Sequence, residues 1–376
     1  MLAQLLATSL WFAPNAVMDA LQAGWGISGG VGPVTTAVQL GFVSGTLCFA
    51  WLTLADRFHP GPLFMVCAVA GALANLLVVW VHEHFHAVLV ARFAVGFFLA
   101  GVYPVGMKMA AAWYGSGLGR ALGFLVAALV LGTASAHLLR GLGAQADWRL
   151  VLFGTSALAA VAGVVAALLP EGPHLRRGGV VHWSDIWKAY RVPRFRSASL
   201  GYFGHMWEIY AFWAFMPVWL AAYGLSGPAL SFTAFAVIGI GAVGCAGGGL
   251  WVRRLGGGRV ALLQLGTSGL CCLVSPLMFG TPAWLFFPFL LLWGLSAAGD
   301  SPQFSALTAR HAPPQAVGSA LTFGNCAGFA LSIGSLWLLE WLQPRLAPDY
   351  LLLALLPGPL LGVIAGRSLW WRDGAD

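Results

Sequence analysis

Three formal charges lie well inside long apolar stretches of the chain: Arg92, Glu208 and Asp300. An ionised group in hydrocarbon costs about 2.5 to 3.5 kcal/mol even on insertion scales, so such residues normally face a cavity or a partner. His205 and Tyr202 precede Glu208 by three and six residues. Because removal from water favours the neutral carboxyl and a histidine can relay a proton, we expect Glu208 and His205 to form a proton-coupling or solute-contacting pair. The alternative is a hydrogen-bonded clamp between helices.

The other two charges allow more than one interpretation. Arg92 could hold an anionic solute or pair with an acid such as Asp19 or Glu208, and its place one or two turns from a helix end also allows it to reach the membrane surface. Asp300, with Gln303 on the same face, is expected near the cytoplasmic end of its helix. There it would brace a gate or contact the solute.

Uncharged polar residues and prolines complete the set of candidates. Asn15 and Asn325 are expected to line a cavity, although hydrogen bonds between helices are the alternative. The prolines at four positions predict kinks in their helices: Pro14, Pro104, Pro217 and Pro302. The residues that we expect to contact a solute are Arg92, Tyr202, Glu208, Asn15, Asn325 and Gln303.

Twelve apolar segments of about 20 residues position these side chains. The chain of 376 residues is 59% hydrophobic and 8% charged, with a mean hydropathy of +0.82, which argues against a water-soluble protein. A backbone in lipid must satisfy its own hydrogen bonds, so each segment is predicted to be a spanning helix. The segments are 2–22, 33–54, 61–81, 87–107, 119–139, 150–169, 197–221, 229–252, 260–280, 284–304, 317–341 and 350–369.

The Lys and Arg residues are distributed unevenly between the two sides. With a cytoplasmic N-terminus, three basic residues face outward: Arg140, Arg149 and Arg345. Fifteen face the cytoplasm: Arg57, Lys108, Arg120, Arg176, Arg177, Lys188, Arg191, Arg194, Arg196, Arg253, Arg254, Arg259, Arg310, Arg367 and Arg372. This asymmetry predicts both termini in the cytoplasm, and it explains the net charge of +7 without a nucleic-acid partner. The first helix begins near residue 1 and lacks a basic leader, so we expect no cleavable signal peptide and at most a short N-terminal tail.

The two halves of the chain share three landmarks at a nearly constant offset. Gly101-Val-Tyr-Pro104 matches Gly299-Asp-Ser-Pro302, at an offset of 198. Gly119-Arg-Ala-Leu-Gly-Phe124 matches Gly318-Ser-Ala-Leu-Thr-Phe323, at an offset of 199. The third landmark pairs Asp56-Arg57 with Arg253-Arg254, at an offset of 197. A shared period indicates duplication, with domains at 1–170 and 197–376 and a basic central loop at 171–196 that carries a short amphipathic helix.

Six plus six helices with these motifs resemble the major facilitator superfamily. Leu54-Ala-Asp-Arg57 is similar to the family's conserved gate loop, which implies gating roles for Asp56 and Arg57. The matching loop of the second half implies the same for Arg253 and Arg254, although an arginine stands where the family has an aspartate. We group Asp300 with these gating residues.

Arg92 followed by Gly96 resembles the family's membrane-embedded arginine motif. The family's nitrate carriers use paired arginines on helices 2 and 8, which carry no charge here. The glycine-proline signature that marks many drug–proton antiporters in helix 5 is also missing.

The resemblance implies an all-α membrane protein of twelve transmembrane helices in two pseudo-symmetric six-helix bundles that rock around a central site. We expect a monomeric secondary transporter in a bacterial-type inner membrane that moves a small organic solute or anion, coupled to protons. Multidrug efflux by proton antiport is one alternative, and a non-transporting sensor or scaffold is another.

We expect no enzymatic activity, no cofactor and no nucleic-acid partner, since neither a P-loop nor a catalytic constellation is present. The cluster His82-Glu-His-Phe-His86 fills a short outward loop, and we expect no functional metal site there.

Overall fold

The computed structural model describes residues 1–27, 29–114, 118–143, 147–174, 183–313 and 316–371. All regular secondary structure in these ranges is helical. Residues 175–182 of the expected central loop lie outside them, but the short helix expected after them is present as α10 (Trp183–Tyr190). The all-helical fold predicted from the sequence is therefore confirmed.

Within the described residues, ten continuous or interrupted helices are long and apolar enough to cross a membrane. The continuous ones are α3 (Val31–Trp51), α5 (Pro60–Val81), α8 (Leu118–Leu142), α9 (Arg149–Ala167), α14 (Gly257–Met278) and α17 (Val317–Leu342). The interrupted ones are α6 (Phe85–Leu99) with α7 (Tyr103–Trp113), α12 (Gly227–Gly239) with α13 (Gly241–Leu255), α15 (Ala283–Gly299) with α16 (Ser301–His311), and α18 (Pro348–Leu351) with η2 (Leu352–Leu355), α19 (Pro357–Gly366) and η3 (Arg367–Leu369).

Two further expected segments are not among these ten. The first is not one helix but three pieces: α1 (Leu2–Thr8), the single turn η1 (Asn15–Val17) and α2 (Met18–Trp25). The seventh is α11, a continuous helix of 30 residues from Pro193 to Ala222 that keeps Pro217 in its interior. The connecting helix α4 (Leu54–Arg57) follows α3.

The repeated glycine-proline landmarks mark equivalent breaks in the two halves. In the first half the helix is interrupted at residues 100–102, between α6 and α7, and Pro104 occupies the second position of α7. In the second half the break separates α15 from α16 at Asp300, and Pro302 occupies the second position of α16. Proline is tolerated there because the first N–H groups of a helix have no intrahelical acceptor. The kinks expected at Pro104 and Pro302 are therefore confirmed as helix breaks.

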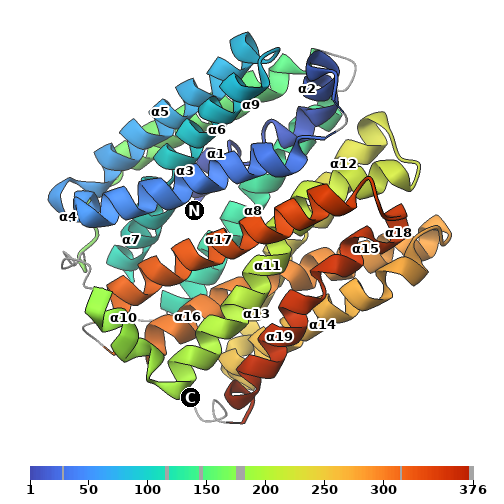
Figure 1. The fold of residues 1–376 in the computed structure, drawn as a ribbon. Helices are drawn as coiled ribbons and strands as arrows, with labels where there is room; N and C mark the ends of the chain where they lie inside the picture. The colour runs from blue at the N-terminus through green and yellow to red at the C-terminus, as the bar shows by residue number, and fades with distance from the viewer. Residues whose placement is uncertain (28, 115–117, 144–146, 175–182, 314–315, 372–376) are drawn as a thin grey trace.

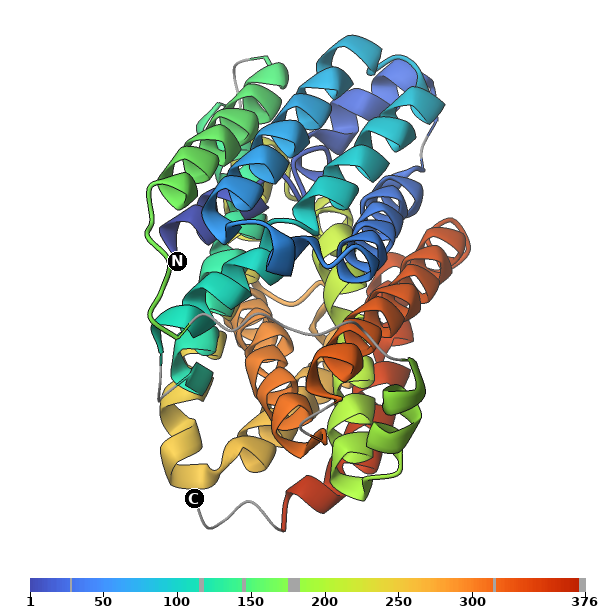
Figure 2. The same cartoon turned by 90° about the vertical axis from the view of Figure 1, so that its left-hand side faces the viewer.

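The two halves pack as separate bundles that meet mainly along four spanning segments. In the first half α3 packs against α6 and α5 against α9; in the second, α11 packs against α19 and α14 against α15. Contact between the halves runs through α3 with α17 and through α8 with α12 and α13 (Figures 1 and 2). Helices α4, α7 and α10 lie at one end of the molecule, which we call the basic end, and α2, α12 and α18 lie at the opposite end.

Glycines allow the closest contact inside the second half. A Cβ atom at Gly204 of α11 would lie 2.8 Å from the Cα atom of Gly362 in α19, closer than real Cβ contacts occur. Gly358 and Gly362 recur four residues apart on α19 and meet α11 at the same place. Small residues at this spacing let membrane helices approach with their backbones in contact.

Gly204→Ala is expected to lower the thermal unfolding midpoint in detergent, because overpacking a closed contact costs about 1–3 kcal/mol. Gly247→Ala is the matched control, since a Cβ atom at Gly247 has no neighbour within 4 Å. We expect that variant to unfold at or above the wild-type temperature, because alanine favours helix over glycine. Equal midpoints for the two variants would contradict the close contact of α11 with α19.

Candidate functional site

The three charges singled out in the apolar segments are all buried. Arg92 and Asp300 have no exposed surface, and Glu208 is 1% exposed. They do not form one cluster. Arg92 lies on α6 in the first half, whereas Glu208 on α11 and Asp300 between α15 and α16 both belong to the second half.

The shortest contact among the candidates joins His205 to Asp300. His205 Nδ1 lies 2.7 Å from Asp300 Oδ1, with side chains that are 4% and 0% exposed. The distance is that of an ion pair between two buried groups. Asp300 was expected near a gate. Instead, the break between α15 and α16 holds it against α11 in the buried interior.

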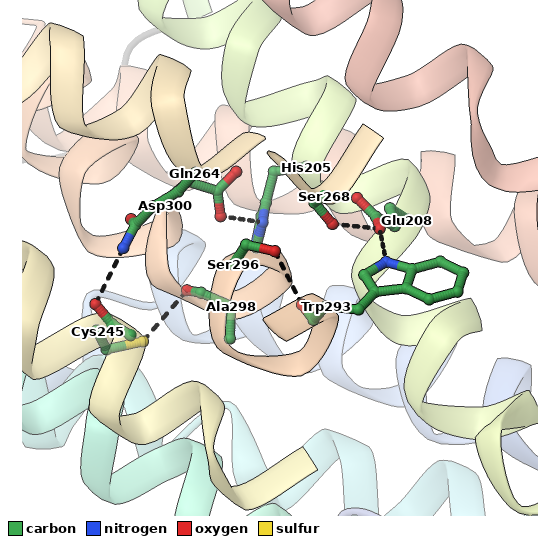
Figure 3. A network of polar contacts seen from close by, with 10 residues as sticks. His205, Glu208, Cys245, Gln264, Ser268, Trp293, Ser296, Ala298 and Asp300 are labelled. Carbon is green, nitrogen blue, oxygen red and sulfur yellow. Dashed lines mark hydrogen bonds and ion pairs between the residues drawn. The ribbon is translucent and has the colours of Figure 1, made fainter. Parts of the chain in front are cut away.

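Glu208 has its own partners on α14 and α15. Ser268 Oγ donates to Glu208 Oε1 at 2.5 Å and Trp293 Nε1 donates at 2.8 Å. Cys272 Sγ lies 3.4 Å from the same oxygen. Figure 3 shows Asp300 beside His205, and Glu208, further along α11, beside Ser268 of α14 and Trp293 of α15. The expected pair of Glu208 with His205 is therefore replaced by two separate contacts, one for each side chain.

The stretch Gly201-Tyr-Phe-Gly-His-Met-Trp-Glu208 uses adjacent faces of α11 for different contacts. Gly201 and Gly204 lie against α16 and α19. Tyr202 and His205, three residues apart, line a cavity between the halves. Glu208 points away from that cavity toward α14 and α15. One helix thus connects the cavity, the Asp300 carboxylate and the close packing of the second half.

The central cavity is small in this conformation. Its volume is about 40 Å³, enough for a few water molecules. Hydroxyl and amide groups gather on it from both halves, and Tyr202 Oη donates to Asn325 Oδ1 at 3.0 Å. Its lining is Tyr103, Val126, Leu129, Val130, Tyr202, His205, Met206, Ile209, Tyr210, Trp213, Ala298, Ser301, Ser305, Asn325 and Phe329. The structure therefore gathers Tyr202, His205 and Asn325 here, but not Arg92, Asn15, Gln303 or Glu208.

An aromatic layer separates this cavity from the opposite end. The Phe42 and Phe329 rings, from α3 and α17, lie 4.7 Å apart, and Tyr210 of α11 lies 4.9 Å from Phe329. Trp11 contacts all three at 5.2 to 5.5 Å. All four rings are buried. Toward the basic end, in contrast, Ser301 and Ser305 of the cavity lining remain partly exposed.

Beyond the aromatic layer lies a vestibule of about 330 Å³ at the opposite end. Asn15 lines it and donates through Nδ2 to Thr35 Oγ1 at 2.8 Å. His137, Asp19 and Arg140 line it as well, and Arg140 Nη2 donates to Asp19 Oδ2 at 2.9 Å. Asn15 is therefore a vestibule residue rather than part of the central cavity.

Arg92 supports the break in the first helix. Its Nη1 donates to the Leu10 carbonyl at 3.1 Å, and its Nη2 donates to the Trp11 carbonyl. The Leu10 carbonyl has no helical donor because the residue four positions later is Pro14, which has no N–H. Neither expected acid, Asp19 or Glu208, is its partner, and its burial excludes a position at the membrane surface.

The expected gating residues lie at the basic end. Lys108 of α7 forms an ion pair with Asp56 and donates to the Ala55 carbonyl at 2.5 Å. Arg57 donates through Nε to Thr53 Oγ1 at 3.0 Å. The exposed Arg253 and Arg254 end α13, and Gln303 is buried within α16. Lys108 was missed in the sequence because its spacing from Asp56 follows no local pattern.

Comparisons with known proteins agree with this architecture. A family model described as Major Facilitator Superfamily matches residues 1–335. The solved structure of the proton:xylose symporter XylE bound to 6-bromo-6-deoxy-D-glucose is similar, with a TM-score of 0.76 and 13% identity over 99% of this chain and 94% of that one. The solved structure of a mutant of the nucleoside transporter NupG is also similar. Its TM-score is 0.71 and its sequence identity 13%, over 98% of this chain and 97% of that one. No curated protein sequence matches the chain.

Proposed function

Because this chain belongs to the major facilitator superfamily and is therefore a membrane transporter rather than an enzyme, we propose that it couples transport of a small uncharged organic solute to protons. The two bundles would rock around the central cavity, which would open to each end in turn. The basic end would face the cytoplasm of a bacterial-type inner membrane, with both termini on that side. The chain would act as a monomer.

The observation that carries the coupling is the position of His205. One side of this residue lines the central cavity, and its Nδ1 lies 2.7 Å from a carboxylate that has no exposed surface. Addition or removal of one proton changes the charge of this pair beside the solute space, where the dielectric is low. A proton taken up from one side would therefore alter how the second half packs around the cavity.

The chemistry of the cavity lining supports an uncharged solute over an anion. Beside His205, its polar groups are hydroxyls, one amide and one indole N–H: Tyr103, Tyr202, Tyr210, Ser301, Ser305, Asn325 and Trp213. Arg92 was the cation expected to bind an anionic solute, but its guanidinium donates to backbone carbonyls instead. Hydroxyl and aromatic groups together suit a ligand with its own hydroxyls or a flat ring. The similar structures are of a xylose symporter and a nucleoside transporter, so monosaccharides and nucleosides are the first compounds to test.

His205→Gln is expected to abolish solute accumulation driven by a pH gradient in proteoliposomes, while exchange of solute between the two sides continues. Glutamine fills a similar space but cannot carry the proton. His137→Gln is the matched control, because His137 is equally buried but lines the vestibule rather than the cavity. The assay uses a panel of labelled monosaccharides, nucleosides, small carboxylates and lipophilic cations.

Three outcomes would count against parts of the proposal. Accumulation by His205→Gln at the wild-type level would remove this residue from coupling. Transport at a rate independent of the pH gradient would indicate facilitated diffusion rather than proton coupling. A preference for lipophilic cations would favour drug efflux.

A further inference from the structure

A carboxylate joins the two halves at the opposite end of the molecule. Glu340 lies near the end of α17, and its Oε1 accepts a hydrogen bond from the Gly30 N–H at 2.5 Å. Its Oε2 accepts one from the Gly32 N–H at 2.8 Å. Both donors lie at the start of α3. The contact therefore links the eleventh spanning segment to the second.

The start of α3 is built to hold a negative charge. The first N–H groups of a helix have no acceptor within it, and the helix dipole places partial positive charge there. Gly30 precedes the helix with a φ of 113°, a left-handed conformation that glycine adopts without strain. Hydrogen bonds to an ionised carboxylate are about twice as strong as neutral ones. Glu340 thus makes a two-bond, charge-assisted contact across the halves.

Glycine also brings the two chains together at this point. A Cβ atom at Gly32 would lie 3.0 Å from the Cβ of Glu340 and 3.3 Å from the Leu336 carbonyl oxygen. A larger residue at position 32 would therefore have to displace Glu340 or the Leu336 carbonyl by a few tenths of an ångström. The contact depends on backbone proximity as well as on charge.

The same two helices carry two of the four rings of the aromatic layer that covers the central cavity. Phe42 of α3 and Phe329 of α17 lie 4.7 Å apart, and they are closer to the cavity than the Glu340 contact along both helices. If α3 and α17 separated where they reach the opposite end of the molecule, these two rings would move apart. A contact that holds these ends together therefore holds the cover in place.

We propose that Glu340, bound to Gly30 and Gly32, is a latch that keeps the central cavity closed at the opposite end. Access from that side requires the carboxylate to leave both N–H groups. This inference rests on the alternating access proposed above, but its test needs no solute. Glu340 is a positioning residue, since it acts on the cavity through the separation of α3 and α17.

Glu340→Gln tests the latch with little change in size. A glutamine oxygen can accept one of the two hydrogen bonds, but its NH₂ group would face the other N–H. The reporter is Val130→Cys, which lines the central cavity and is 1% exposed. A membrane-impermeant maleimide is added on the side of the membrane that the opposite end faces. We expect the rate of labelling of this cysteine to be at least about tenfold higher in Glu340→Gln than in protein with Glu340 intact. Protein without the reporter gives the background of the six native cysteines.

Two further variants make the result decisive. Gly32→Ala is expected to raise labelling from the same side, because its Cβ atom would press on Glu340 and the Leu336 carbonyl without a change of charge. Glu83→Gln removes an exposed acid from the same end and is expected to leave labelling unchanged. Labelling of Glu340→Gln within twofold of the Glu83→Gln control would overturn the latch, whatever Gly32→Ala does. Faster labelling in a protein that moves no tested solute would keep the latch and count against the proposed function.

Discussion

Asp300→Ala is expected to lower the free energy of unfolding by about 3–5 kcal/mol, because removal of one member of a buried charge pair leaves the other uncompensated. Asp300 has no exposed surface and lies 2.7 Å from His205. The measurement is the unfolding midpoint of the purified protein in detergent, followed by circular dichroism. Glu83→Ala replaces an exposed acid and is the control. Its unfolding midpoint should equal that of the wild type.

The double variant His205→Leu with Asp300→Leu separates a true pair from two independent losses. Replacement of both members by apolar residues leaves no unpaired charge, so the double variant is expected to be more stable than Asp300→Ala alone. A double-mutant cycle with the two leucine singles gives the interaction energy. Additive losses would show that the two residues do not stabilise one another, and the coupling role of His205 would lose its structural basis.

The spanning segments could be predicted from the sequence because lipid imposes a length and a composition on each of them. The breaks could be anticipated as well, since Pro104 and Pro302 fall in matching landmarks of the two halves. The cost of charge in an apolar segment indicated that Arg92 and Asp300 face a cavity or a partner, but it left Arg92 the alternative of the membrane surface and did not place Asp300 in the interior. The features that could be predicted depend on local sequence alone.

The partners of the buried groups could not be predicted, because they depend on how each helix is rotated about its axis. Asp300 lies 95 residues after His205, and hydropathy does not specify which faces of the two helices meet. Ser268 and Trp293 carry no signal as partners of Glu208, since serine and tryptophan are ordinary in membrane helices. Arg92 did have a signal that was missed: Pro14 leaves the Leu10 carbonyl without its helical donor.

The two repeats use equivalent breaks differently. The residue that matches Asp300 in the first half is Val102, which is buried and apolar. The first half instead places its buried charge, Arg92, on the broken first helix. The breaks therefore recur in both halves, whereas the carboxylate that lies against His205 has no counterpart at Val102.

Arg92→Ala is expected to destabilise the protein by about 3–6 kcal/mol, because each of two hydrogen bonds from a charged donor contributes about 1.5–3 kcal/mol. The loss would free the carbonyls of Leu10 and Trp11 in a buried segment. Arg92→Lys retains a cationic donor and should recover part of the stability. Thermal unfolding in detergent measures both variants.

Pro14→Ala provides the test that separates support of the first helix from solute binding. Alanine restores an N–H four residues after Leu10, so the helix can satisfy that carbonyl itself. If Arg92 acts by donating to this carbonyl, Pro14→Ala should restore stability to the Arg92→Ala variant. The same substitution should change the stability of the wild type only slightly. If Arg92 instead bound an anionic solute, Arg92→Ala would weaken uptake of that solute without a change in unfolding, and Pro14→Ala would rescue nothing. The broken first helix thus accounts for the burial of this arginine, because its guanidinium replaces the N–H that Pro14 lacks.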